Sequence, residues 1–87
     1  MRLAKFVKFR EEKFGGVLFE TRSEKVFTLN PTAAAVVREV QAGLDEKEIA
    51  ARLKEHFEGP SDALERDISA LIAELRMKGL IEDSPRG

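Results

Sequence analysis

The sequence predicts an α+β fold in which a three-stranded antiparallel sheet precedes three helices. Residues 6 to 29 contain three short runs rich in valine, phenylalanine and threonine, separated by turn residues, as is typical of strands joined by hairpins. From residue 31 to residue 79 the apolar residues recur every three or four positions, which is the period of an amphipathic helix. One face of such a sheet must be covered, and three amphipathic helices can cover it.

The length of 87 residues allows one small domain and not two. We expect this domain to comprise residues 1–82 and to be followed by a flexible polar tail, residues 83–87. The chain has no cysteine, which excludes disulfides and thiolate metal sites and fits a cytoplasmic protein. No apolar run approaches the roughly 20 residues of a membrane-spanning helix, so we expect no membrane association.

The three strands are expected within residues 6–29, in the runs FVKFREE, GGVLFET and KVFTLN. If the second hairpin is closed by the three residues 22–24, Phe19 lies opposite Phe27. Because strand side chains alternate, one face then carries a set of four apolar residues that we expect to be buried. These residues are Val17, Phe19, Phe27 and Leu29. The register of the first strand stays open, since Phe6 and Phe9 point to opposite faces.

The third strand is expected to be an edge of the sheet with little protection against pairing. It carries a single charged residue, Lys25, and has no proline inside it. Such an edge can be shielded by a helix, paired in a dimer, or used to receive a peptide as an added strand.

Capping residues define the starts of the helices, which we expect near residues 31–42, 46–57 and 62–78. Asn30 is a good N-cap, and Pro31 occupies the first helical position, where its missing N–H costs nothing. Asp45 followed by Glu48 forms a capping box at the start of the second helix. The stripe expected to face the core from the third helix is Leu64, Ile68, Leu71 and Leu75, with Ile72 on its flank.

Charge and side-chain chemistry argue against two common functions. The net charge is −1, and the second and third helices each carry more acidic than basic residues, which does not suit a phosphate backbone. His56 is the single histidine, and the acidic pairs 11–12 and 45–46 have no histidine beside them. With no cysteine, no tyrosine and no glycine-rich phosphate loop, we expect no catalytic residue, no cofactor and no metal site.

An ordered set of positions resembles the PqqD family of peptide chaperones, also called the RiPP recognition element. These positions lie in LNPTAAAVVREVQAG, in the helix that follows, and in LERDISALIAELRMKGLI. They are Leu29, Asn30, Thr32, Ala33, Gly43, Ile49, Leu53, Asp67, Leu71, Leu75, Gly79, Leu80 and Ile81. The resemblance covers roughly residues 14 to 81. Because the start FREEKFGGVLF is unlike the member of the pyrroloquinoline quinone pathway, we expect the family and not that pathway.

The resemblance implies a winged-helix-like domain, and the missing catalytic groups predict that it is not an enzyme. It implies that the leader of a precursor peptide adds to the third strand, lies against the third helix, and is presented to an enzyme, often of the radical S-adenosylmethionine type. The edge would then comprise Lys25, Val26, Phe27, Thr28 and Leu29. Beside it, Ile68, Ile72 and Leu75 would form the floor of a cleft and Arg76 its charged rim. A homodimeric scaffold that pairs its sheet edges and a DNA-binding regulator remain as alternatives, and the chain is expected to be a monomer or a homodimer.

Overall fold

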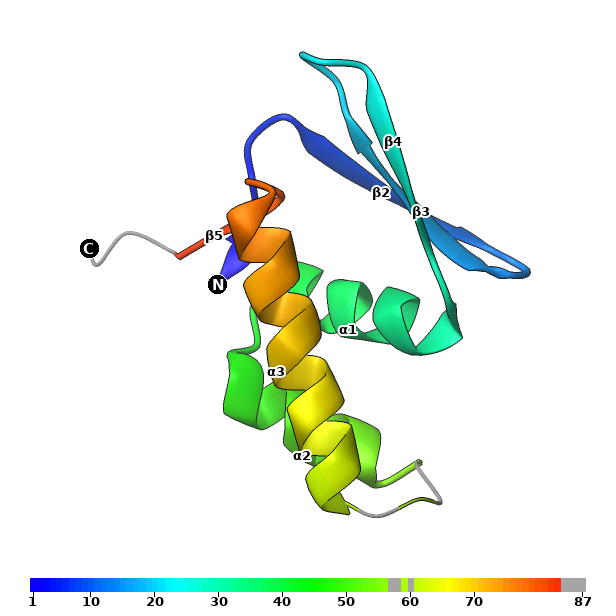
Figure 1. Ribbon diagram of the computed structural model, residues 1–87, viewed down its shortest axis with the longest axis vertical. Helices are drawn as coiled ribbons and strands as arrows, with labels where there is room; N and C mark the ends of the chain where they lie inside the picture. Colours follow the sequence, from blue (N-terminus) through cyan, green and yellow to red (C-terminus); the bar gives the residue numbers. More distant parts are fainter. Residues whose placement is uncertain (57–58, 60, 84–87) are drawn as a thin grey trace.

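The computed structural model describes residues 1–56, 59 and 61–83. The main sheet has the strand order β2-β3-β4, both pairings are antiparallel, and three helices follow it. The strands are β1 (Arg2–Leu3), β2 (Val7–Glu12), β3 (Gly15–Glu20), β4 (Lys25–Leu29) and β5 (Ile81–Glu82). The helices are α1 (Pro31–Gln41), α2 (Glu46–Lys54) and α3 (Ser61–Met77). This arrangement confirms the α+β class and the predicted order of a three-stranded sheet before three helices (Figure 1).

The register of the second hairpin differs from the prediction by one residue. Leu18 lies opposite Phe27, and the turn between Glu20 and Lys25 has four residues instead of three. The expectation that Val17 and Phe19 are buried was therefore wrong, because they lie on the outer face of the sheet. Leu18 takes their place on the inner face and is fully buried.

The inner face of the sheet is continuous across all three strands. Phe9 pairs with Leu18, which pairs in turn with Phe27, so the three side chains lie in one row. Val7 occupies the same face of β2 and is buried, which settles the register of the first strand. Leu29 lies two residues after Phe27 on the same face of β4 and is also buried.

Helix α1 packs against the inner face of the sheet (Figure 1) and presents Val36, Val37 and Val40, all fully buried. It begins where the capping residues predict. The side chain of Asn30 accepts a hydrogen bond of 2.8 Å from the amide of Ala33, and Pro31 is the first helical residue. The short distance in sequence between β4 and α1 therefore fixes where the third strand ends.

Helix α2 begins with the predicted capping box. The amide of Glu48 donates to the Asp45 carboxylate at 2.9 Å, and the amide of Asp45 donates to the Glu48 carboxylate at 3.0 Å. The helix ends at Lys54, three residues before the expected end, and the expected stripe residue Phe57 lies outside the described residues.

Helix α3 buries the predicted stripe except at one position, where Ile72 takes the place expected for Leu71. The fully buried residues are Leu64, Ile68 and Ile72, and Leu75 is nearly so, whereas Leu71 is only partly buried. Two residues after the end of the helix, Gly79 adopts a left-handed conformation with φ of 74°. The amide of Leu80 returns to the carbonyl of Leu75 at 2.9 Å, which turns the chain back toward the core.

The two ends of the domain meet in a ribbon that sequence periodicity did not reveal. Strands β1 and β5 pair antiparallel, with Arg2 opposite Glu82 and Leu3 opposite Ile81. The Arg2 Nε lies 3.0 Å from a Glu82 carboxylate oxygen. Each strand has two residues, too few for an alternating pattern to be visible in the sequence. Apart from Asp83, the expected flexible tail lies outside the described residues.

Candidate functional site

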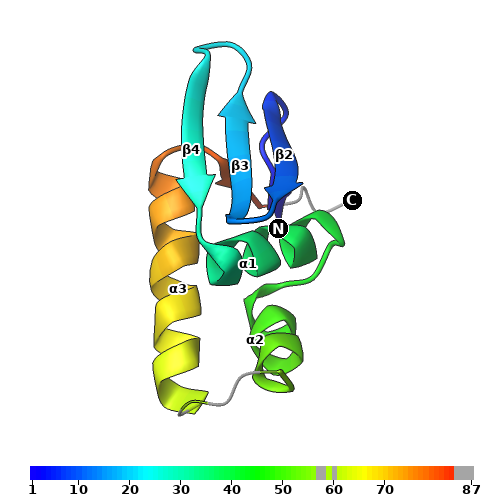
Figure 2. The same ribbon diagram turned by 90° about the vertical axis from the view of Figure 1, so that its right-hand side faces the viewer.

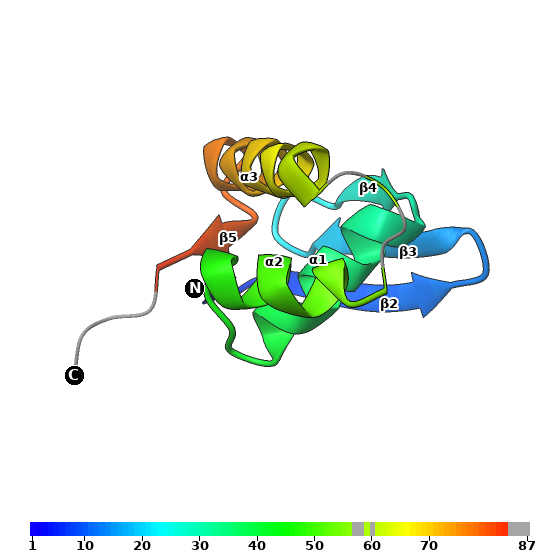
Figure 3. The ribbon, with the colours of Figure 1, turned by 90° about the horizontal axis from the view of Figure 1, so that it is seen from below.

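Strand β4 is an edge strand with a helix running alongside it. It pairs with β3 alone, so the other side of its backbone carries no strand among the residues that the structure describes. Helix α3 lies on the β4 side of the molecule, away from β2, in both the side view and the view from below (Figures 2 and 3). This arrangement confirms the prediction that the third strand is an edge of the sheet.

A groove of about 450 Å³ lies between β4 and α3. From the strand side and the start of α1 it is lined by Val26, Phe27, Thr28, Leu29, Asn30 and Ala33. From the helix side it is lined by Leu71, Glu74, Leu75, Lys78 and Leu80. The positions 71, 74, 75 and 78 follow the spacing of one helix face, so α3 presents a continuous wall to the strand.

The floor of the groove is apolar. Leu29, Leu75 and Leu80 lie at the bottom with less than a tenth of their surface exposed. Phe27 and Leu71 are half-buried, one on each wall, and present their remaining surface to the groove. An apolar side chain entering between these two residues would exchange water contact for contact with both walls.

The rim of the groove is charged. Lys78 Nζ lies 2.9 Å from a Glu74 carboxylate oxygen, one helical turn away. The same ammonium lies 5.4 Å from the centroid of the Phe27 ring, within the range of a cation–π contact. Lys78 therefore spans from the helix to the strand above the apolar floor.

A second hollow of about 540 Å³ extends the groove toward the turn between β3 and β4. The two hollows share Phe27, Lys78 and Leu80. The second also includes Lys25 and the ion pair of Arg22 with Glu20, whose Nε and carboxylate oxygen are 3.5 Å apart. Together the hollows follow β4 along its length, which is the shape that an extended segment would occupy.

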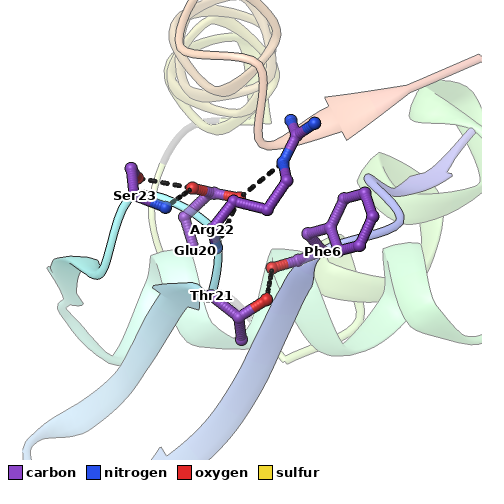
Figure 4. A network of polar contacts seen from close by, with 5 residues as sticks. All are labelled: Phe6, Glu20, Thr21, Arg22 and Ser23. Carbon is purple, nitrogen blue, oxygen red and sulfur yellow. Dashed lines mark hydrogen bonds and ion pairs between the residues drawn. The ribbon is translucent and has the colours of Figure 1, made fainter.

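The turn at the start of β4 is held by a polar network (Figure 4). The Glu20 carboxylate accepts hydrogen bonds from the hydroxyl of Ser23, from the Ser23 amide at 2.6 Å and from the Arg22 amide at 3.2 Å. These bonds, chiefly those from Ser23, lower the pKa of Glu20 to about 2. They favour the four-residue turn that sets the register of β4, together with Glu24, which adopts φ of 62°.

Contacts to Phe6 anchor the same turn to the start of β2. The Thr21 hydroxyl donates to the Phe6 carbonyl at 3.1 Å, and the Thr21 amide donates to it at 2.8 Å (Figure 4). The Arg22 guanidinium lies over the Phe6 ring, 4.5 Å from its centroid. The end of the groove is therefore tied to the opposite edge of the sheet.

The structure brings six of the nine predicted site residues to the groove. Lys25, Val26, Phe27, Thr28, Leu29 and Leu75 line one or both hollows. The expectation that Ile68 and Ile72 form the floor was wrong, because neither residue lines the groove and both lie within the core. The placement of Arg76 at the rim was also wrong, because its guanidinium pairs with Asp83 at 2.8 Å near the β5 ribbon.

Sequence reasoning missed the residues of α3 that face the groove. Leu71 was expected in the core stripe, and neither Glu74 nor Lys78, which directly follows the helix, was among the predicted site residues. The signal that could have identified them is their spacing, since 71, 74, 75 and 78 share a helix face beside the buried stripe. Because two of these four side chains are apolar and two are charged, they do not form the apolar stripe by which a helix face is usually identified.

The described residues contain no cluster of histidine, aspartate or glutamate that could hold a metal ion. Within the same part of the chain, no helix is long and apolar enough to cross a membrane. The acidic pair at positions 11–12 takes part in ion pairs, Glu11 with Arg38 at 3.3 Å and Glu12 with Arg10 at 2.6 Å.

Comparisons with known proteins agree with this geometry. The family described as coenzyme PQQ synthesis protein D (PqqD) matches residues 15–81. A solved structure described as lasso peptide synthetase B1 complexed with the leader peptide is 30% identical, with a TM-score of 0.82, over 94% of this chain and 96% of that one. A second, TbiB1 in complex with the TbiA(beta) leader peptide, shares the fold at 19% identity, with a TM-score of 0.87, over 99% of this chain and 100% of that one. No curated protein sequence matches. The match to the PqqD family spans most of the chain, including β4, α3 and the groove between them, and this protein therefore belongs to the PqqD family.

Proposed function

We propose that this protein binds the leader of a ribosomally made precursor peptide as an added strand on β4 and presents it to a modifying enzyme. In this proposal it performs no chemistry itself. The observation that carries the proposal is the groove between β4 and α3, which lies beside the open edge of the sheet. The 30% identical structure, a lasso peptide synthetase B1 complexed with its leader peptide, supports the same role for this chain.

The main chain of β4 supplies the first part of the interaction. Alternate N–H and C=O groups along Lys25–Leu29 face the open edge, because the remaining groups pair with β3. A leader lying antiparallel to β4 satisfies these groups with its own backbone. Such bonds provide affinity with little preference for sequence.

The groove supplies the second part, which is selection of side chains. An apolar leader residue lies between Phe27 and Leu71, the two half-buried apolar groups on opposite walls. At the turn end, Lys25 favours an acidic leader residue, whereas the Arg22 guanidinium already pairs with Glu20. Arg76, which sequence reasoning chose for this role, points instead toward Asp83.

The partner enzyme in this proposal belongs to a lasso peptide synthetase, as the name of the 30% identical structure suggests. The radical S-adenosylmethionine enzyme implied by the sequence resemblance is the alternative, and the genes beside this one distinguish the two. We propose that the protein works in the cytoplasm, where a ribosomally made precursor is released.

A matched pair of variants on α3 tests the groove. Leu71→Asp places a charge where the leader's apolar side chain lies, and calorimetry with the precursor leader encoded nearby should show at least a tenfold loss of affinity. That loss corresponds to about 1.4 kcal/mol. Ala73→Asp introduces the same charge at an exposed position of the same helix that does not line the groove. The control should bind as wild type; equal losses for both variants would contradict the assignment of the groove.

Amide hydrogen exchange tests strand addition independently of side chains. On leader binding, every second amide between Lys25 and Leu29 should become protected, because only alternate amides face the added strand. Unchanged exchange along β4 in a saturated complex would place the leader elsewhere. A chain that self-associates through β4 and binds no leader would favour the homodimeric scaffold.

A further inference from the structure

The backbone of Lys78 is fixed, whereas its side chain extends across the groove. Lys78 directly follows α3, and its amide donates to the carbonyl of Glu74 at 3.0 Å. The amide of the next residue, Gly79, donates to the carbonyl of Arg76 at 3.0 Å, and Gly79 turns the chain with φ of 74°. The ammonium of Lys78 can therefore change position only by rotation about the bonds of its four-carbon side chain.

The Lys78 ammonium occupies space that a bound leader needs. It lies 5.4 Å from the centroid of the Phe27 ring, and the proposed function places an apolar leader residue between Phe27 and Leu71. Phe27 is half-buried, so only part of its ring is open to the groove. The ammonium and the apolar leader residue compete for that part. In the free protein the side chain of Lys78, here called the strap, therefore closes the mouth of the groove.

Two weak contacts hold the strap closed. One is the exposed ion pair with Glu74 at 2.9 Å, one helical turn away, and the other is the cation–π contact with Phe27. Contacts of these two kinds together favour the closed position by a factor of about three to ten. The apparent affinity for a leader is lowered by the fraction of the protein that is open, so the strap weakens leader binding by a similar factor.

A leader carboxylate can replace the contacts that the strap loses on opening. Lys78 borders both hollows, and Lys25 borders the second one together with Phe27. Lys25 and Phe27 are two residues apart in β4 and lie on the same face of the strand. In a leader antiparallel to β4, the residue two positions after the apolar one therefore lies opposite Lys25 and also faces the groove. A carboxylate at that position lies between Lys25 and the released ammonium of Lys78.

The acidic side chains that border these hollows leave the two lysines available. The Glu20 carboxylate is already bound by the Ser23 amide at 2.6 Å and by the Arg22 side chain at 3.5 Å. The Glu74 side chain has 59% of its surface exposed, so water solvates its carboxylate when the strap opens. Neither acidic group needs Lys78 to remain in place.

We infer that Lys78 is a specificity-determining residue, which makes the groove select leaders with an acidic residue two positions after the apolar one. The inference rests on the proposed function. A leader with a neutral residue at that position displaces the ammonium without replacing its contacts. A leader with a carboxylate there pairs with the displaced ammonium, and this pair offsets the cost of opening the strap.

Two versions of the precursor leader encoded beside this chain test the selection. They carry either Glu or Gln at the position opposite Lys25, which nuclear Overhauser contacts between the two strands identify. Calorimetry should show that wild type binds the Glu leader at least fivefold more tightly than the Gln leader. Lys78→Gln removes the strap, so it should tighten binding of the Gln leader by about three- to tenfold and reduce the Glu-to-Gln preference.

Lys54→Gln is the matched control. Lys54 forms the same kind of exposed ion pair, with Glu65 at 3.1 Å, and its side chain is 46% exposed, against 45% for Lys78. It lies on α2 and does not line the groove. The control removes the same charge from the chain, so it should leave the preference for the Glu leader as in wild type. Equal changes for the two variants would assign the effect to net charge and overturn the inference.

NMR spectroscopy observes the strap directly. In the free protein, the ring current of Phe27 should shift the protons next to the Lys78 ammonium upfield. Phe27→Leu should abolish that shift without any leader, and saturation of wild type with the Glu leader should abolish it as well. A shift that persists in the saturated complex would show that the strap does not open, and the inference would be wrong.

The wild-type titrations separate this inference from the proposed function. If both leaders bind and Lys78→Gln leaves their affinities unchanged, or weakens binding of the Gln leader, Lys78 is not a selective strap and the inference fails alone. If neither version of the leader binds wild type, the proposed function fails and the inference fails with it.

Discussion

The ammonium nitrogen of Lys78 lies 5.4 Å from the centroid of the Phe27 ring, and this contact joins α3 to β4 across the mouth of the groove. Because Lys78 also pairs with Glu74 at 2.9 Å, its ammonium is held from the helix side as well. The two walls of the groove are therefore connected by one side chain.

A double-mutant cycle measures this connection. Lys78→Gln removes the charge, and Phe27→Leu removes the aromatic face while keeping an apolar side chain. Urea unfolding of the two single variants and the double variant should give a coupling free energy of about 0.5–1 kcal/mol, the range for an exposed cation–π pair. Strict additivity of the two changes would show that the contact does not stabilise the groove.

The reversed roles of Leu71 and Ile72 lead to a stability prediction. Ile72 is fully buried, so Ile72→Ala should lower the free energy of unfolding by about 2–5 kcal/mol through lost burial and a cavity. Leu71 is only partly buried, so Leu71→Ala should cost less than half as much. Urea melts of both variants measure the two losses of unfolding free energy. A larger loss for Leu71→Ala would mean that α3 is rotated so that Leu71 faces the core in place of Ile72.

Gly15 is predicted to be intolerant of any side chain. Its φ is 140°, and a Cβ there would lie 2.1 Å from the carbonyl oxygen of Leu29, at the end of β4. Gly15→Ala should therefore destabilise the protein by more than about 1 kcal/mol. Gly43→Ala is the control, because Gly43 also has a positive φ, of 91°, but has open space around it. Equal losses in urea would show that backbone conformation alone accounts for the effect.

The Glu20 carboxylate makes the turn before β4 sensitive to acid. Hydrogen bonds from Ser23 lower its pKa from 4.5 to about 2. A carboxylate whose pKa is lower in the folded than in the unfolded protein stabilises the fold at pH values above its unfolded-state pKa. That stabilisation is lost as the pH falls from about 4.5 toward 2. Unfolding midpoints over this range should fall less steeply for Glu20→Gln than for wild type. Parallel curves for the two proteins would mean that the carboxylate does not hold the turn.

Local chemistry determined much of the fold from the sequence alone. The Asn30 cap, the capping box of Asp45 and Glu48, and the glycine at position 79 each act within a few residues, so their outcome does not depend on the rest of the chain. The open edge of β4 was also predictable, because a meander of three strands leaves its third strand paired on one side only.

Tertiary structure decided which side chains face the core and which face the groove. Leu71 and Ile72 are adjacent, and helical spacing permits a stripe through either. The packing of α3 against α2 and α1 places Ile72 in the core and leaves Leu71 at the groove. In the sheet, the fourth turn residue admitted by the Glu20 network moves Leu18 inward and Phe19 outward. The sequence determined the elements and their order, because these follow from local periodicity and capping. Which side chains face the core depended on a one-residue shift in the register of the sheet and on the rotation of α3 about its axis. Only packing fixes these two features.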